Sequence, residues 1–102
     1  MNPEQSIQNK SSLAIYRNAL SRYIRSTMVL KELKYDDLVS DLDAKGVYLT
    51  AENLRSKVSK GMFSADLLLL LFETMQVSDS ACDEILKIVK ASTEIEKGAK
   101  AK

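Results

Sequence analysis

The chain has 102 residues, 28% of them charged, and a formal net charge of +1. Its length allows one small domain and excludes two, and the scarcity of glycine, proline and β-branched runs predicts an all-α fold. A charge so close to neutrality excludes a global electrostatic argument for nucleic acid, so a basic surface would have to come from local clustering.

Residue types that support catalysis are scarce. The sequence has no histidine and one cysteine, so the usual general bases, nucleophile pairs and metal clusters are missing, and we expect neither an enzyme nor a cofactor. The carboxylates of Asp36, Asp37, Asp41 and Asp43 could hold a cation in principle. The first three are explained more simply as the solvated face of a helix start. The three glycines are isolated, which excludes a glycine-rich phosphate loop.

The cellular location of the protein is predicted from three features: the absence of a signal-peptide pattern, the absence of a long apolar run, and the single cysteine. Residues 1–12 have no apolar core of a signal peptide, and the apolar run Leu67–Phe72 is too short to span a bilayer. Cys82 has no partner for an internal disulfide, which suits a reducing compartment, and we expect it to be a half-buried structural residue. The expectation is a cytoplasmic protein without a membrane segment.

The first third of the chain is predicted to be a flexible arm and a long helix. Residues 1–11 are polar, so we expect an arm that is either plainly disordered or touches DNA. From Ser12 apolar residues recur at spacings of three and four: Leu13, Tyr16, Leu20, Tyr23, Ile24, Met28 and Leu30. The opposite face is basic and would either meet phosphates or face solvent; it carries Arg17, Arg22, Arg25 and Lys31.

The middle of the chain has the order of a helix-turn-helix. A second helix is expected from Asp36 to about Lys45, with Leu38, Val39 and Leu42 inward. Gly46 closes it, and the apolar residues of Val47–Leu49 should anchor a short connector in the core. A short polar helix then follows the glycine-containing turn.

That short helix, in the stretch Thr50–Ala65, is the candidate DNA-recognition helix. Thr50 can cap its start, and Gly61 fits the left-handed position that ends a helix. Only a narrow stripe is apolar, made of Ala51, Leu54 and Val58, so the wide outer face is polar and basic. A helix this short is marginal alone and must be held by its neighbours.

Two further helices complete the predicted domain, which spans residues 12–96. Residues 64–76, capped by Ser64, are apolar nearly all round, which predicts a buried central helix on which the others pack, or one partly buried between subunits. Ser78 or Ser80 caps a last helix to about Glu96. Its apolar stripe would pack inside the molecule or form a dimer seam, and comprises Ala81, Ile85, Leu86, Ile88, Val89 and Ile95. Residues 97–102 are expected to be a disordered tail.

The segment from Asn53 to Ala65, NLRSKVSKGMFSA, preceded by the helix start YDDL at residues 35–38 and by Gly46, resembles a small uncharacterised prokaryotic domain family. Members carry N-L-R-x-K-(aliphatic)-x-(basic)-G-x-F-S-A after a Y-x-x-L helix. The family is similar to a variant of the lambda-repressor-like (Cro/repressor type) helix-turn-helix fold. The resemblance covers Leu30 to Val77 and implies a five-helix bundle, to which this chain adds a longer N-terminal helix and a C-terminal helix.

The resemblance implies roles for the polar face of the third helix. It places at or beside DNA the residues Asn53, Arg55, Ser56, Lys57, Ser59 and Lys60. Asparagine and arginine can read base edges, whereas lysine and serine commonly reach phosphates, to which Arg17, Arg22 and Arg25 of the first helix would add. Arg55 or Lys57 could instead pair with Glu52 or Asp43. Phe63 and Ser64 are expected to be a core anchor and a helix cap.

Two functions remain open. The first is a bacterial or phage transcription regulator, such as a repressor, that binds double-stranded DNA as a homodimer. The second is an α-helical adaptor or inhibitor that keeps this shape and binds a protein partner, which the acidic helices beside the basic stretch favour. A recognition helix covered by the N- or C-terminal helix would support the second.

Overall fold

Five α-helices form the chain in the computed structural model, which describes residues 2–77 and 79–100, with the side chains of the last helix up to Glu94. They are α1 (Pro3–Leu30), α2 (Tyr35–Ala44), α3 (Ala51–Lys60), α4 (Ala65–Met75) and α5 (Ala81–Lys100). The described residues contain no strand, so the predicted all-α class and the helix count are confirmed.

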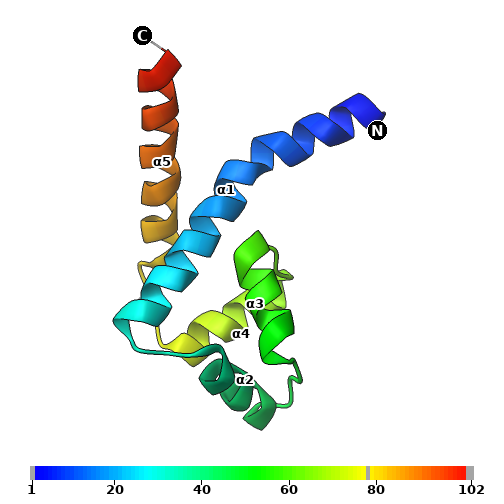
Figure 1. The fold of residues 1–102 in the computed structure, drawn as a ribbon, viewed down its shortest axis with the longest axis vertical. Coiled ribbons are helices and arrows are strands. Elements are labelled where there is room, and N and C mark those ends of the chain that lie inside the picture. Colours follow the sequence, from blue (N-terminus) through cyan, green and yellow to red (C-terminus); the bar gives the residue numbers. More distant parts are fainter. Residues whose placement is uncertain (1, 78, 101–102) are drawn as a thin grey trace.

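The long helix α1 is the element that joins the two parts of the molecule. It packs against α5 on one side and α3 on another, while α2 packs against α3 and α4. Figure 1 shows α1 and α5 diverging like the arms of a V, with α2, α3 and α4 gathered beside the lower half of α1. The N- and C-terminal ends therefore lie at the two open ends of the V.

The core is centred on α1 and not on the leucine-rich helix. Ile24 of α1, Leu38 and Leu42 of α2, and Leu54 of α3 are fully buried. In α4 the buried residues are Leu71 and Met75, while Leu68, Leu70 and Phe72 are partly buried against the core. Leu69 in the same run is 69% exposed. The prediction that α4 is a buried central helix on which the others pack is therefore wrong.

An aromatic contact links α1 to α4. The rings of Tyr23 and Phe72 meet edge to face with centroids 6.0 Å apart. Burial raises the pKa of the Tyr23 phenol, and the nearby Glu84 carboxylate of α5 adds to this rise, partly offset by a hydrogen bond with Thr27. Tyr23 is therefore a core residue where three helices meet.

α1 begins nine residues before the predicted start at Ser12. The side chain of Asn2 accepts a hydrogen bond from the backbone N–H of Gln5, and the Gln5 side chain accepts one from Asn2 in return. Pro3 follows at the first helical position, where its missing N–H costs nothing. The predicted helix start at Ser12 is therefore wrong, and the segment expected to be a flexible arm is helical from Pro3 onward.

Several apolar side chains at the two ends of α1 lie outside the core. Leu13 and Tyr16 are 54% and 49% exposed, and Leu30 is 83% exposed, so their predicted inward positions are wrong. Near the N-terminal end, α5 has already diverged and no other helix is present to cover α1 (Figure 1). Periodicity identified the helix, but the length of helix that neighbours cover depends on the tertiary arrangement.

α5 packs on α1 through part of the predicted stripe. Ala81 and Val89 are buried, and Ile85 and Ile88 pack against the core. Leu86 is 49% exposed, and the side chain of Ile95 lies outside the described residues. The helix continues to Lys100, so the predicted tail is helical at residues 97–100, and residues 101–102 lie outside the description.

The predictions for cysteine and serine residues near the start of α5 have mixed outcomes. Cys82 is exposed, so its expected half-buried position is wrong. Ser78 lies outside the described residues. The carbonyl oxygen of Ser80 accepts a hydrogen bond from the N–H of Glu84, as the residue before a helix should.

Two glycines with positive φ provide a test of the packing. Gly61 has φ 64°, and a Cβ there would collide with the backbone of Arg17, whereas Gly46 has φ 87° and open space around it. We expect Gly46→Ala to destabilise the fold by about 1 kcal/mol through backbone strain alone. Gly61→Ala should cost about 3 kcal/mol, because α1 must also move. Urea unfolding of both variants measures the difference, and equal losses would contradict the close approach of α1 and α3.

Candidate nucleic-acid interface

The helix α3 is held at its start by a side-chain cap. The hydroxyl of Thr50 accepts a hydrogen bond of 3.0 Å from the backbone N–H of Asn53, and Glu52 lies in the first turn, where its charge favours the positive end of the helix. Leu54 and Val58 are 0% exposed and face α1 and α2. The predicted cap and inner stripe are confirmed.

The other end of α3 rests on α1. Gly61 takes the left-handed conformation, and the N–H groups of Gly61 and Met62 return to the carbonyl oxygens of Val58 and Lys57, each at 3.1 Å. The missing side chain of Gly61 lets the backbone of Arg17 pass close by. The glycine thus ends the helix and sets the distance between α3 and α1.

The outer face of α3 is open to solvent. The exposed residues of this helix are Glu52, Asn53, Arg55, Ser56, Ser59 and Lys60, and Lys57 is half-buried. Four of them line one shallow groove together with Leu49 and Met62: Asn53, Ser56, Lys57 and Lys60. The structure thus brings four of the predicted site residues into one continuous surface.

Arg55 lies on the other flank of α3. Its guanidinium carbon stands 5.1 Å from the centroid of the Tyr35 ring, a cation–π contact with the first residue of α2. The proposed pairing of Arg55 or Lys57 with Glu52 or Asp43 is not observed in the part of the chain described here. The ion pair found there joins Lys45 to Glu73, with 3.6 Å between the nitrogen and the oxygen.

The three arginines of α1 are distributed over different surfaces. Arg17 belongs to the stretch that contacts the end of α3, and its guanidinium donates to the carbonyl oxygen of Lys10 at 2.9 Å. Arg22 faces the opening between α1 and α5, near Ser92. Arg25 borders this opening and also a second cavity next to Arg55. Arg17 and Arg25 are therefore the two α1 arginines near α3.

A scan of protein-family models matches residues 16–80 to a domain of unknown function, DUF6471. The chain belongs to this family. A search of curated proteins and a search of solved structures both return no match. The DUF6471 segment comprises the C-terminal half of α1 and all of α2, α3 and α4, so α5 and the exposed start of α1 lie outside it.

Within the DUF6471 segment, Tyr35 and Met62 are the neighbours of the site that sequence reasoning missed. The second helix is predicted to start at Asp36, yet Tyr35 begins it and supports Arg55. Met62 is 57% exposed at the edge of the groove. No local pattern signals either contact, because each depends on how α3 packs against the rest of the fold.

The caps around α4 differ in part from expectation. Ser64 occupies the capping position, but its side chain accepts no backbone hydrogen bond there. Instead a hydrogen bond with Ser64 lowers the pKa of the Asp66 carboxyl, and the N–H of Leu67, which donates to Asp66 at 2.8 Å, lowers it further. Phe63 is half-buried and packs against the core, as predicted.

Other kinds of site receive no support from the described residues. Among them no three histidine, cysteine or acidic side chains gather closely enough to hold a metal ion. No helix within the same residues combines the length and apolar character needed to cross a membrane. The open polar face of α3 is therefore the leading candidate surface.

The cap at Thr50 should decide how well this surface is ordered. We expect Thr50→Ala to lower the free energy of unfolding by about 1 kcal/mol, because the N–H of Asn53 loses its partner. Thr50→Ser keeps the hydroxyl oxygen and should lose much less. Urea unfolding followed by far-UV circular dichroism compares the two, and an equal loss in both would show that the hydrogen bond contributes nothing.

Proposed function

We propose that this chain is a sequence-specific double-stranded DNA-binding transcription regulator of bacterial or phage type, with α2 and α3 acting as its helix-turn-helix. The observation that carries the proposal is the open outer face of α3. Leu54 and Val58 hold the helix from within, while neither α1 nor α5 covers its polar side. A covered α3 would have favoured a role without DNA.

The chemistry of the groove beside α3 suits a nucleic acid. Asn53 can bond both N6 and N7 of adenine, and Lys57, Lys60 and Ser56 can reach phosphate oxygens. All four border the same groove. Arg55 would approach from the other flank, where its guanidinium can bridge O6 and N7 of guanine.

A single α3 would bind few base pairs, so the proposal includes a homodimer. Two copies would present their recognition helices to half-sites about one helical turn apart. The phosphate contacts would supply most of the affinity and make it depend on salt. Arg17, whose backbone lies beside the end of α3, would add such a contact if its guanidinium left the carbonyl oxygen of Lys10.

An α-helical protein-interaction module is the alternative, and exposed apolar side chains favour it. Tyr48 and Met62, on the loops at the two ends of α3, are 77% and 57% exposed, and the first turn of α2 carries Asp36 and Asp37. An apolar rim with acidic neighbours suits a protein surface better than a phosphate backbone. An adaptor or inhibitor would use the same face of the molecule without DNA.

Lys60→Ala tests the phosphate contact. We expect this variant to bind both random duplex DNA and the DNA upstream of its own gene several-fold more weakly, with a salt dependence reduced by about one charge. Lys90→Ala, an exposed lysine of α5 far along the chain from α3, serves as the matched control and should bind as the parent does. Fluorescence anisotropy over a salt series measures the binding of the parent and both variants to each of the two DNA fragments.

Arg55→Ala tests base recognition in the same assay. We expect it to reduce the preference for the upstream fragment, by up to about 1–3 kcal/mol for a lost guanine contact, while binding to random DNA changes less. If the parent protein binds neither fragment at low salt, the DNA function is rejected and the interaction module takes its place.

A further inference from the structure

A second cavity lies on the Arg55 flank of α3, separate from the groove of the proposed recognition surface. Its volume is about 680 Å³, and it lies between the end of α1, the connector to α2, the start of α2, and α3. Its apolar wall comes from Met28, Val29, Leu33 and the ring of Tyr35. The hollow is open to solvent, and its mainly apolar lining can cover one side of a small organic molecule.

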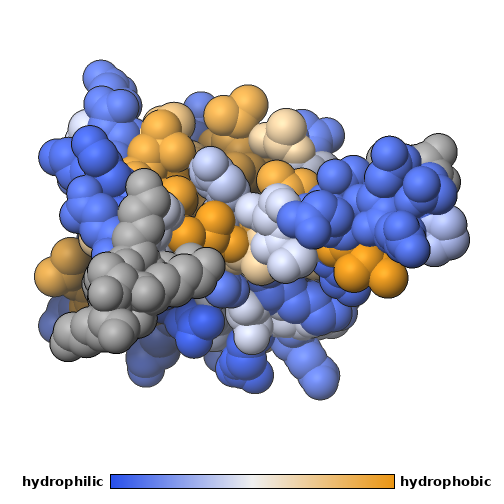
Figure 2. All heavy atoms as spheres, turned by 90° about the horizontal axis from the view of Figure 1, so that it is seen from above, coloured by the Kyte–Doolittle hydropathy of each residue, from blue (hydrophilic) through white to orange (hydrophobic). Residues whose placement is uncertain are grey.

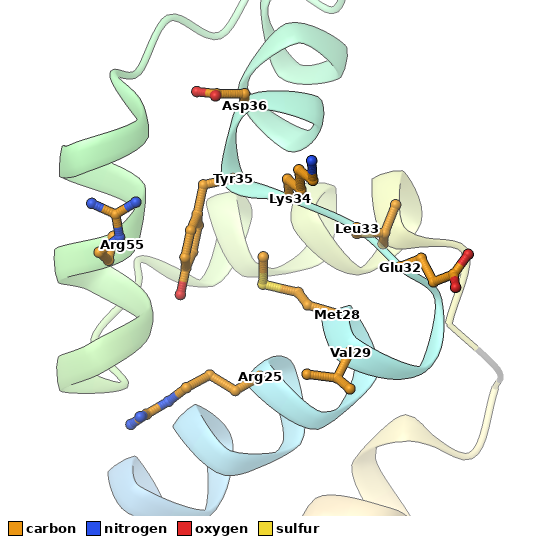
Figure 3. Close-up of a pocket in the computed structure, with 9 residues that line it drawn as sticks. All are labelled: Arg25, Met28, Val29, Glu32, Leu33, Lys34, Tyr35, Asp36 and Arg55. Carbon is orange, nitrogen blue, oxygen red and sulfur yellow. The ribbon is translucent and has the colours of Figure 1, made fainter.

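The polar side of this cavity is cationic. Figure 3 shows the guanidinium of Arg55 beside the ring of Tyr35, whereas the guanidinium of Arg25 extends away from both. The carboxylates of Glu32 and Asp36 and the ammonium of Lys34, which also border the cavity, point outward in the same view. The cationic group that lies against the aromatic part of the wall is therefore Arg55.

Both arginines are already positioned. Arg25 donates two hydrogen bonds to the hydroxyl of Ser21, at 2.6 and 3.1 Å, and the Ser21 side chain is itself buried. Arg55 is stacked on Tyr35. Side chains that are held in place before a ligand arrives lose less conformational entropy when they bind it.

We propose that this cavity binds a small organic anion with an apolar body. Its carboxylate or sulfonate would bind Arg55, since a guanidinium group binds a planar oxyanion by paired hydrogen bonds. Its apolar body would cover Met28, Val29 and Tyr35. An inorganic anion would meet the same arginine but leave the apolar wall exposed to water.

Binding of an anion at this site would also regulate DNA binding. This consequence rests on the proposed DNA function. Arg55 borders the cavity and is also proposed to contact a base. A bound anion would neutralise Arg55 and hold it against Tyr35. Occupancy of the cavity and base recognition by Arg55 would then exclude each other.

The test uses 8-anilinonaphthalene-1-sulfonate, an aromatic sulfonate whose fluorescence rises in apolar sites, titrated into the folded full-length protein without DNA. We expect saturable binding at one site. Val29→Asp adds a negative charge at a position that is 78% exposed, and Arg55→Ala removes a cation; each should weaken binding at least about tenfold. Leu69→Asp, the same type of change at a 69% exposed position of α4, is the control and should bind as the parent does.

Two competitors, added separately to the protein with bound probe, show which kind of anion the site accepts. Sodium phosphate at equal ionic strength should not displace the probe, whereas DNA of the upstream fragment should. Absence of saturable binding, or binding unchanged by both Val29→Asp and Arg55→Ala, would overturn the site. If phosphate displaces the probe, an anion without an apolar body can occupy the site, and the requirement for an apolar body is overturned. Because the titration needs no DNA, a protein that fails to bind DNA still tests the cavity.

Discussion

The burial of Leu54 and Val58 is the interaction on which the candidate surface depends. A ten-residue helix is marginal in water, because the cost of starting a helix is spread over few hydrogen bonds. Full burial of these two side chains contributes about 1.5–3 kcal/mol each, which holds α3 against α1 and α2. With so few inward residues, most of the circumference of α3 stays free for polar side chains. The same narrow stripe that makes α3 dependent on its neighbours makes it available to a partner (Figure 1).

α3 could be predicted in detail because its signals are local. The Thr50 cap, the spacing of Leu54 and Val58, and the glycine at position 61 all lie within twelve residues, and the structure confirms each. The start of α1 had an equally local signal in Asn2, Pro3 and Gln5, a capping box that was overlooked in a segment of polar composition. Composition describes what a segment can bury, whereas a cap describes where a helix can begin.

The remaining differences come from contacts between distant parts of the chain. The leucine run of α4 predicted a buried central helix, yet Leu71 and Met75 are its buried residues and Leu69 stays exposed. Cys82, expected to be half-buried, is exposed, whereas its neighbour Ala81 is buried. Seen from above, apolar side chains are visible in the middle of the molecule, beside the polar projecting start of α1 (Figure 2). How far a helix extends beyond its neighbours cannot be predicted from its own periodicity.

The two flanks of α3 differ in chemistry although the whole chain is nearly neutral. Leu54 fixes the inward direction, and Arg55 and Lys57 then project to opposite sides of it, since successive residues of a helix turn by about 100°. Lys57 borders the polar groove, and Arg55 borders the apolar cavity beside Tyr35. The net charge of the whole sequence does not show this separation, because the two flanks are defined only once Leu54 is buried. One short helix can therefore expose a polar surface suited to a phosphate backbone and, on its other side, a cationic rim suited to a small apolar anion.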